Sequence, residues 1–256
     1  MLSQPYPILE YDDAREAIIE PAKLIAPLNE MPERGVLCFF REVIDGLVQA
    51  GKLRLIRNLR SEMGAHPVYA LDVNGQSVAV AHPGVGAPLT AALLEEMIAL
   101  GGRKFIACGG AGVLDRAIVA GHVIIPSHAV RDEGTSYHYL PPGREVAASP
   151  AAVAAIEQVL RELGVPYIVG KTWTTDAFYR ETPVKIARRR AEGCLTVEME
   201  AAAFFAVAQF RGIGFGQILY GGDDVSGAEW DARRWDERST TREKLFWLAV
   251  EADLRL

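Results

Sequence analysis

Two carboxylates separated by one residue, Glu198 and Glu200, precede the apolar segment 201–208. A helix that is apolar on every face is normally buried, so these carboxylates are expected at the mouth of a buried helix. An acid is tolerated there because it opposes the positive end of the helix dipole, but a buried carboxylate still needs hydrogen-bond donors. Either the acids cap the helix or form an internal ion pair, or a ligand rich in hydroxyl groups supplies the donors.

Two glycine-rich segments, 84–86 and 109–112, follow predicted strands. Glycine turns let a ligand approach the backbone closely, and their exposed amides suit anions. In parallel sheets, ligands collect at the carboxyl ends of the strands, where both turns are expected to lie. Tight packing also explains a glycine cluster, but two such turns favour an anion site more than one does.

Aromatic and acidic residues follow two further predicted strands. Phe178 lies in the segment 173–182, and an aromatic ring of this kind can stack on a base. Asp223 or Asp224, at another strand end, can donate a proton if partial burial raises its pKa. Because carboxylates accept hydrogen bonds from sugar hydroxyls, the whole set can bind an anion, an aromatic ring and a diol. This combination of residues predicts an enzyme that cleaves the glycosidic bond of a nucleoside.

Other polar segments allow two interpretations each. The segment 127–139 is dense in polar and aromatic groups, so it is either a functional loop or a surface loop braced by internal hydrogen bonds. Arg54, Arg57 and Arg60 alternate with apolar residues, which is typical of a solvated sheet edge. The basic run 188–190 predicts a solvated helix face or an ion-paired contact between subunits.

Strand and helix patterns alternate along the chain, which predicts an α/β domain with helices on both faces of a sheet. The predicted strands are 36–40, 67–73, 76–81, 104–108, 119–126, 167–170, 193–197 and 213–220. The predicted helices are one within 8–30 and those at 41–51, 89–100, 150–163, 183–192, 200–211 and 239–254. Asn74-Gly75 indicates a tight hairpin. No linker or repeat divides the sequence, so residues 1–256 are expected to form one domain.

Composition excludes several classes of protein. The chain has 256 residues, is 50% hydrophobic and carries a formal net charge of −6, which argues against broad binding to nucleic acid. It has no apolar run of about 20 residues, so no membrane span is expected. Its first residues do not resemble a secretory signal, and Cys38, Cys108 and Cys194 are expected to be reduced core residues of a cytoplasmic protein. No Cys/His cluster has metal-ligand spacing, so no metal site is predicted.

The segment Val197-Glu198-Met199-Glu200-Ala201-Ala202 resembles the signature of the nucleoside phosphorylase superfamily. Bacterial members of that superfamily include uridine phosphorylase, hexameric purine nucleoside phosphorylase and methylthioadenosine/S-adenosylhomocysteine nucleosidase. The similarity extends over about residues 64–226. It includes 105–112 as the phosphate-site strand and turn, 131–139 as a loop similar to that of uridine phosphorylases, 175–179 as the base-stacking stretch, and 222–225 as the acid-bearing stretch of the purine enzymes.

The resemblance implies a three-layer α/β/α fold with a central mixed sheet, and it implies roles for individual residues. Glu200 would hold the ribose 2′- and 3′-hydroxyls, and Met199 would pack under the sugar with Glu198 nearby. Phe178 would stack on the base, and Asp223 would donate a proton to a purine leaving group. The phosphate would be bordered by Gly84, Gly109 and Gly110.

The sequence departs from the family pattern at the phosphate end. The family's Gly-Asp-Pro-x-Arg loop is not found, and 10–15 is a poor substitute for it. Ala107 replaces the phosphate-binding arginine of the phosphorylases' strand, and Gly110 replaces their Ser or Thr. A phosphate dianion needs charge-assisted donors. Arg57 or Arg60, lent by a neighbouring subunit, is expected to supply one.

Arg131 is another predicted donor, on the substrate side of the site. We therefore predict a nucleoside phosphorylase that uses inorganic phosphate as co-substrate and needs neither a metal nor an organic cofactor. The alternatives are a nucleosidase, which uses water, and a non-catalytic nucleoside-binding protein. The 131–139 loop favours a pyrimidine base and Asp223 favours a purine, so base preference stays open. The resemblance also implies a homodimer or a homohexamer.

Overall fold

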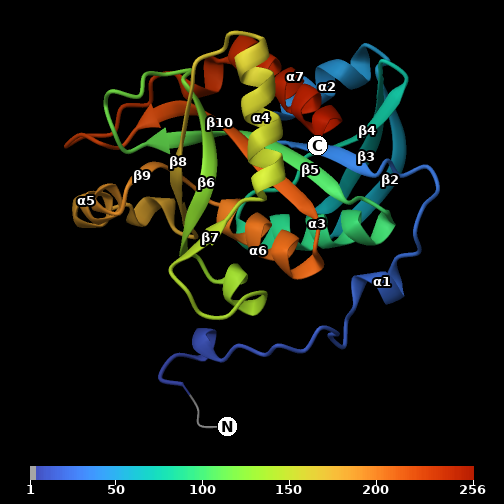
Figure 1. Ribbon diagram of the computed structural model, residues 1–256, viewed down its shortest axis with the longest axis horizontal. Helices are drawn as coiled ribbons and strands as arrows, with labels where there is room; N and C mark the ends of the chain where they lie inside the picture. The colour runs from blue at the N-terminus through green and yellow to red at the C-terminus, as the bar shows by residue number, and fades with distance from the viewer. Residues whose placement is uncertain (1–3) are drawn as a thin grey trace.

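The computed structural model describes residues 4–256, in which one ten-stranded sheet lies between layers of helices (Figure 1). The strands are β1 (Arg34–Cys38), β2 (Leu53–Ser61), β3 (Gly64–Val73), β4 (Gln76–Ala81), β5 (Lys104–Val113), β6 (Val123–Asp132), β7 (Glu145–Ala147), β8 (Tyr167–Thr175), β9 (Cys194–Glu198) and β10 (Gly214–Asp224). The helices are α1 (Pro21–Leu24), α2 (Arg41–Gln49), α3 (Ala87–Leu100), α4 (Pro150–Glu162), α5 (Pro183–Ala191), α6 (Ala201–Arg211) and α7 (Ser239–Arg255). The short 3-10 helices are η1 (Pro7–Leu9), η2 (Thr135–His138), η3 (Phe178–Arg180) and η4 (Trp235–Glu237).

The sheet has the strand order β10-β6-β8-β9-β5-β1-β4-β3-β2, with β7 paired to β6. An additional pairing joins β10 to β5, so β5, β10, β6, β8 and β9 form a closed ring. Within the ring, β5 runs parallel to β10 and antiparallel to β9. The predicted α/β class with a central mixed sheet is therefore confirmed.

The glycines at 109–112 do not form the predicted turn, because they continue β5 as far as Val113. A Cβ atom at Gly110 would lie 3.1 Å from ring carbons of Tyr220, and one at Gly112 would lie 3.1 Å from Cγ1 of Val197. The absence of side chains lets β10 and β9 pack closely against the same strand. These glycines therefore serve the closure of the ring, which a local sequence pattern does not reveal.

Three other strands are longer than predicted, and for the same reason. The polar segment 127–132 belongs to β6, 171–175 belongs to β8, and 221–224 belongs to β10. Pairing with neighbours in the ring satisfies the backbone of these polar stretches, and tertiary pairing outweighs weak strand propensity. Loop predictions at 127–132, 173–175 and 221–224 were therefore wrong.

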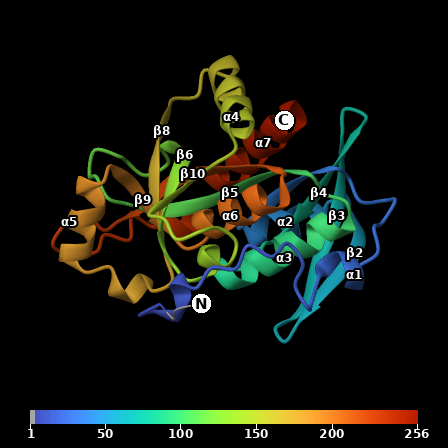
Figure 2. The same ribbon diagram turned by 60° about the horizontal axis from the view of Figure 1, so that its bottom comes forward.

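The predicted helix within 8–30 is reduced to α1, which has four residues. Pro21 occupies its first position, and the helix ends before Pro27, in keeping with the exclusion of proline from helix interiors. Figure 2 shows this N-terminal segment as the blue chain that runs across the front of α3. Arg15 fixes it to α6 by donating a hydrogen bond of 2.7 Å to the carbonyl of Phe210.

Several local predictions are confirmed. Asn74 and Gly75 have φ values of 50° and 78° and join β3 to β4, as a hairpin turn requires. The strand β2 lies at the end of the sheet, and its three arginines are exposed.

Two apolar layers cover the sheet. Helices α3 and α6 pack on one face, and α2, α4 and α7 pack on the other (Figure 1). All residues of 201–208 in α6 are buried, which confirms the interpretation of the apolar run. Burying this helix fixes the residues at its N-terminus, where the two acidic residues lie.

Candidate functional site

The candidate site lies where the parallel strands β1, β4, β5 and β10 end. Strand β9 approaches from the opposite direction and pairs with β5 at Gly112 and Val113 alone. This short antiparallel overlap brings the end of β9, with Glu198 to Glu200, beside the glycines of β5. The mixed sheet thus assembles residues that a purely parallel sheet would separate.

Glu198 is a buried internal cap of α6. Its Oε2 accepts hydrogen bonds from the backbone amides of Glu200, at 2.7 Å, and Ala201, at 2.6 Å. Its Oε1 accepts bonds from the hydroxyls of Thr174, at 2.6 Å, and Thr172, at 3.4 Å. Burial raises the pKa of Glu198 to about 6, while these bonds oppose the rise. The chain itself satisfies both oxygens, so Glu198 has a structural role in positioning its neighbours.

Glu200 is buried beside it and joins two parts of the site. Its Oε1 accepts a bond of 2.7 Å from the amide of Gly86, and its Oε2 accepts one of 3.2 Å from the amide of Met199. Burial first, and then the charge of Glu198, raise the pKa of Glu200 to about 8. Each oxygen has one backbone donor and keeps acceptor capacity for a ligand hydroxyl. Met199 is half-buried between the two acids.

The segment after β4 carries two glycines with positive φ, Gly84 at 81° and Gly86 at 87°. A Cβ atom at Gly84 would lie 2.5 Å from the side chain of Leu89, so the turn requires glycine there. Gly86 is the residue before α3, a helix of 14 residues whose N-terminus carries a positive partial charge. This geometry suits an anion.

Arg41 is a functional candidate that sequence reasoning missed. It is the exposed first residue of α2, and it follows β1 at the same edge of the sheet. Its charge lowers the pKa of His82, after the larger effect of burial. His82 in turn accepts a bond of 3.1 Å at Nδ1 from the amide of Gly84. The charge of Arg41 thus acts on the histidine that contacts the turn suited to an anion.

Gly109 and Gly110 border this region from β5. Gly109 packs under the ring of Phe39, because a Cβ atom there would lie 3.0 Å from that ring. The backbone of Gly110 is exposed although its neighbours in the strand are buried. The ring of Phe39 also contacts His82 edge-on, with centroids 6.0 Å apart, so the two glycine segments face a common space.

The two aspartates at the end of β10 have different surroundings. Asp224 is buried and forms an ion pair with Arg233 at 2.6 Å, so its role is structural. Asp223 is half-buried, and its Oδ2 accepts a bond of 2.7 Å from the indole of Trp230. A Cβ atom at Gly112 would lie 3.5 Å from its Oδ1. Of the two, Asp223 is the one beside the glycine strand.

Glu181 is a second residue that the sequence did not reveal. It follows η3 and is half-buried, and burial raises its pKa to about 7, with the charge of Asp223 as the second cause. A carboxyl group whose pKa is raised by burial and by a neighbouring carboxylate retains its proton more readily. Phe178, at the start of η3, is 50% exposed and stacks on Tyr179 with centroids 4.1 Å apart.

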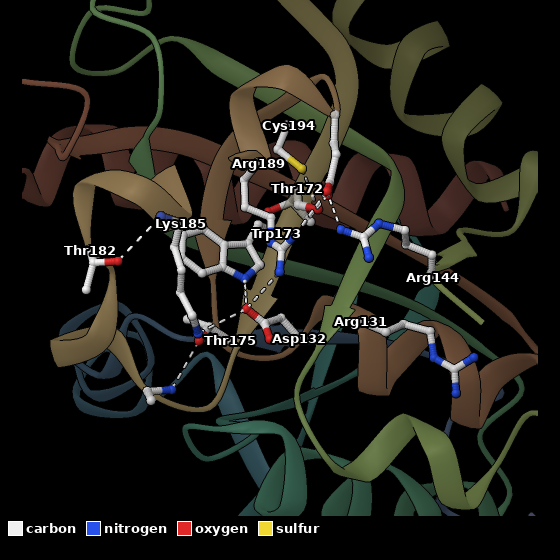
Figure 3. A network of polar contacts seen from close by, with 12 residues as sticks. Arg131, Asp132, Arg144, Thr172, Trp173, Thr175, Thr182, Lys185, Arg189 and Cys194 are labelled. Carbon is white, nitrogen blue, oxygen red and sulfur yellow. Dashed lines mark hydrogen bonds and ion pairs between the residues drawn. The ribbon is translucent and has the colours of Figure 1, made fainter. Parts of the chain in front are cut away.

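A polar network holds the helix that follows this segment (Figure 3). Asp132, at the end of β6, accepts bonds from the indole of Trp173 at 3.0 Å and from Arg189 at 3.1 Å, and Lys185 lies 3.4 Å from it. Arg189 is buried and also pairs with Glu192, whereas its two arginine neighbours are exposed. The basic run is thus partly an internal anchor for α5.

Arg131 lies apart from that network, as Figure 3 shows. Its guanidinium donates to the hydroxyl of Ser136 at 2.8 Å and to the carbonyls of Pro141 and Leu140 at 2.8 and 3.2 Å, and it stacks on Tyr137. These bonds brace the segment 133–143. The side chain is buried, and all of these partners belong to its own chain.

Arg60 lies on the edge strand β2, away from the glycine segments. Together with Arg57 and Glu96 it lines an open cavity of about 500 Å³ between β2 and α3. Within one chain, then, Arg60 faces a separate cavity at the sheet edge.

Comparison with known proteins agrees with this geometry. A family model described as the phosphorylase superfamily matches residues 33–246.

The chain belongs to the phosphorylase superfamily.

Relatives within the superfamily act on different bases by name. The uridine phosphorylase of Salmonella typhimurium is 26% identical over 199 residues, which cover 72% of this chain and 78% of that protein. The guanosine phosphorylase of Halorubrum lacusprofundi is 31% identical over 169 residues, which cover 64% of this chain and 68% of that protein.

Solved structures share the fold of this superfamily member. The uridine phosphorylase of Vibrio fischeri ES114 superposes with a TM-score of 0.74 at 22% identity, covering 90% of this chain and 95% of that one. The AMP nucleosidase of Bacteroides thetaiotaomicron gives a TM-score of 0.71 at 21% identity, covering 88% of each chain. Both likenesses show that this chain has the same fold.

Residues 4–256 include no helix that is both long enough and apolar enough to cross a bilayer. The same residues hold no group of three or more His, Cys, Asp or Glu side chains arranged to bind a metal ion. The three cysteines are buried and unpaired with one another.

Proposed function

We propose that this protein is a nucleoside phosphorylase, which cleaves the glycosidic bond of a nucleoside with inorganic phosphate. The observation that carries the proposal is the hydrogen bond between the Glu200 carboxylate and the Gly86 amide. It joins an acceptor suited to a ribose diol to the turn and helix terminus suited to an anion. Sugar and phosphate bound at these two groups would lie side by side, and such positioning is a large part of catalysis.

The phosphate end is proposed to consist of the Gly84–Gly86 turn, the backbone of Gly109 and Gly110, and Arg41. The turn and the α3 terminus offer amides and a positive partial charge. Arg41 adds the charge-assisted donor that a phosphate dianion needs. Arg60 of a neighbouring subunit is the other source of a cation, because it is exposed at the sheet edge.

The base end is proposed to consist of Phe178, Asp223 and Glu181. Phe178 offers an exposed ring face to the base. Asp223 donates a proton to the leaving base, and Glu181 is a second carboxyl group at this end, with a pKa raised first by burial and then by the charge of Asp223. Stabilisation of the leaving base in this way lowers the barrier to bond cleavage.

Phosphate dependence tests the proposal. Purified enzyme, dialysed free of phosphate, is assayed with uridine, inosine and guanosine at phosphate concentrations from zero to about 10 mM, which extends beyond typical KM values of about 1 μM to 1 mM. A phosphorylase yields ribose 1-phosphate at a rate that rises with phosphate and saturates. Release of free ribose at a rate unaffected by phosphate would instead establish hydrolysis.

Hydrolysis is the second candidate, and one observation favours it. Ala107 and Gly110 offer no polar side chain to phosphate at β5, and Ala107 is fully buried. A protein described as an AMP nucleosidase also has this fold. Nucleoside binding without cleavage, across the same substrate panel and at every phosphate concentration, would support a non-catalytic binding protein.

Base preference, assembly and location complete the proposal. Both a uridine and a guanosine phosphorylase are among the relatives, so the substrate panel includes both classes of base. A homodimer or homohexamer is proposed because the exposed Arg60 would then be available to a neighbouring site. A cytoplasmic location is proposed from the three unpaired, buried cysteines.

A further inference from the structure

Trp230 holds one oxygen of Asp223 although the tryptophan itself is largely exposed. Its indole N–H donates to Oδ2 of Asp223 at 2.7 Å, while 63% of the residue is exposed to solvent. A tryptophan kept at the surface in this way is not held by core packing. The hydrogen bond to Asp223, the candidate proton donor, therefore helps to hold the Trp230 side chain in place.

The backbone fixes Trp230 in this place. Asp224 and Asp231 exchange two backbone hydrogen bonds, of 2.8 and 3.0 Å, which close the loop that carries Trp230. Arg233 reinforces the closure through its ion pair with Asp224 and a bond of 2.7 Å to the carbonyl of Ile118. Trp230 is the residue directly before Asp231, so the closed loop presents the indole to Asp223.

We infer that Trp230 is a positioning residue for Asp223, fixing its carboxyl so that Oδ1 faces the leaving base. This inference rests on the proposed function, because it deepens the role of Asp223 in glycosidic cleavage. Trp230 contacts Asp223 and not the reacting atoms, so it acts through the aspartate. Its residue type matters because an indole can donate a hydrogen bond but cannot accept one.

The donor on Oδ2 determines which oxygen carries the proton. An oxygen that accepts a bond from a fixed N–H is a poor site for a proton, so the proton resides on Oδ1. When the C1′–N bond breaks, its electron pair stays with the base, and the Oδ1 proton moves to the base nitrogen. A phosphate oxygen forms the new bond to C1′. The indole then stabilises the carboxylate left on Asp223, since bonds to charged acceptors are stronger than bonds to neutral ones.

The Trp230→Phe variant tests the inference because it keeps an aromatic ring and removes only the N–H. Trp235→Phe is the matched control, since Trp235 lies in the same segment and packs on Arg242 instead. For a neutral purine nucleoside, Trp230→Phe should lower kcat by about 10- to 150-fold, the range for a hydrogen bond to a charged group. For 7-methylguanosine, the base is already cationic and needs no proton, so the hydrogen bond from Trp230 to Asp223 should not affect the reaction. The kcat for this substrate should change by less than about 3-fold.

A pH profile and a rescue variant separate positioning from a structural role. Loss of the donor weakens Asp223 as an acid, so the limb on which activity falls with rising pH should move to higher pH in Trp230→Phe. Trp230→His, which restores a ring N–H, should recover part of the rate. Equal losses with both nucleosides, or an unchanged profile, would overturn the inference.

A measurement on the free enzyme distinguishes this inference from the proposed function. With ¹³C-labelled aspartate, the carboxyl signal of Asp223 is the one that disappears in Asp223→Asn. The pH midpoint of this signal's titration should rise by about half a pH unit or more in Trp230→Phe, because the charged carboxylate loses one hydrogen bond. It should not change in Trp235→Phe. An unchanged midpoint contradicts the inference even if the enzyme is a phosphorylase. A raised midpoint in a protein that cleaves no nucleoside leaves the contact established and refutes the function.

Discussion

Nucleoside affinity should rise with pH because Glu200 must be ionised to bind a diol well. Its pKa is raised to about 8, by burial first and by the charge of Glu198 second. Below that pH the carboxyl is neutral for most of the time, and its oxygens are weaker acceptors for the ribose hydroxyls. Binding is thus strongest above pH 8 and weakens as the pH falls.

The magnitude follows from the ionised fraction. At pH 6, two units below the pKa, about 1% of Glu200 is ionised, and at pH 9 about 90% is. The nucleoside Kd should therefore fall by roughly 90-fold between these values, which corresponds to about 2.7 kcal/mol. Glu200→Gln keeps an acceptor for Gly86 but cannot ionise, so its Kd should be independent of pH. It should also be weaker than the wild-type plateau by about 1–3 kcal/mol.

Calorimetric titration of nucleoside into phosphate-free enzyme, at half-unit steps from pH 6 to 9, measures this dependence. Asp253→Asn is the matched control because Asp253 has a pKa raised to about 8 by burial, yet lies in α7. That variant should keep the full slope. A flat profile in the wild type, or a slope that survives in Glu200→Gln, would show that Glu200 does not hold the sugar.

Three further predictions address stability, the base and the phosphate. The Asp253 carboxyl has a pKa of 3.8 when exposed to solvent and about 8 in the folded protein, so the folded state retains its proton and loses stability as the pH rises through this range. Asp253→Asn should therefore raise the free energy of unfolding, measured in urea, by about 2–5 kcal/mol at pH 8 and by almost nothing at pH 4. An equal gain at both pH values would contradict this. Phe178→Ala should raise the nucleoside KM by about 5- to 100-fold, on the scale of about 1–3 kcal/mol for one stacked base. The free energy of unfolding should change by under about 0.5 kcal/mol, because the ring is half-exposed. An unaltered KM would show that Phe178 does not contact the base. Arg41→Ala should raise the phosphate KM by about 10- to 100-fold and leave the nucleoside KM within about 3-fold, and a larger effect in Arg60→Ala would identify the edge-strand arginine as the donor instead.

Local sequence patterns predicted the elements whose causes are themselves local. The Asn74-Gly75 turn depends on backbone preferences of two adjacent residues, and the buried α6 follows from an apolar run. The glycines at 109–112 were misinterpreted because their function depends on Tyr220 and Val197, which approach only after the ring closes. A glycine needed for close packing and one needed for a turn look identical in the sequence.

The candidate site shows the same division. The acids at 198 and 200 stand out because charge before a buried helix is unusual, although the sequence could not show that Glu198 is satisfied by its own chain. Arg41 was missed because it resembles any exposed arginine until the end of β1 is placed beside His82. Glu181 was missed because its raised pKa depends first on burial and then on the charge of Asp223, and neither is visible in the local sequence.

The closed ring also has a consequence for synthesis of the chain. Lys104 at the start of β5 pairs with Gly214 at the start of β10, and the two are separated by 110 positions. At about 5–20 residues per second, a ribosome needs roughly 5–20 s to make the intervening chain. During that interval the edge of β5 that will meet β10 has no partner, and an unpaired strand edge invites association with other chains. The nascent protein is thus most exposed to aggregation and to chaperone binding after β5 has emerged and before β10 follows it.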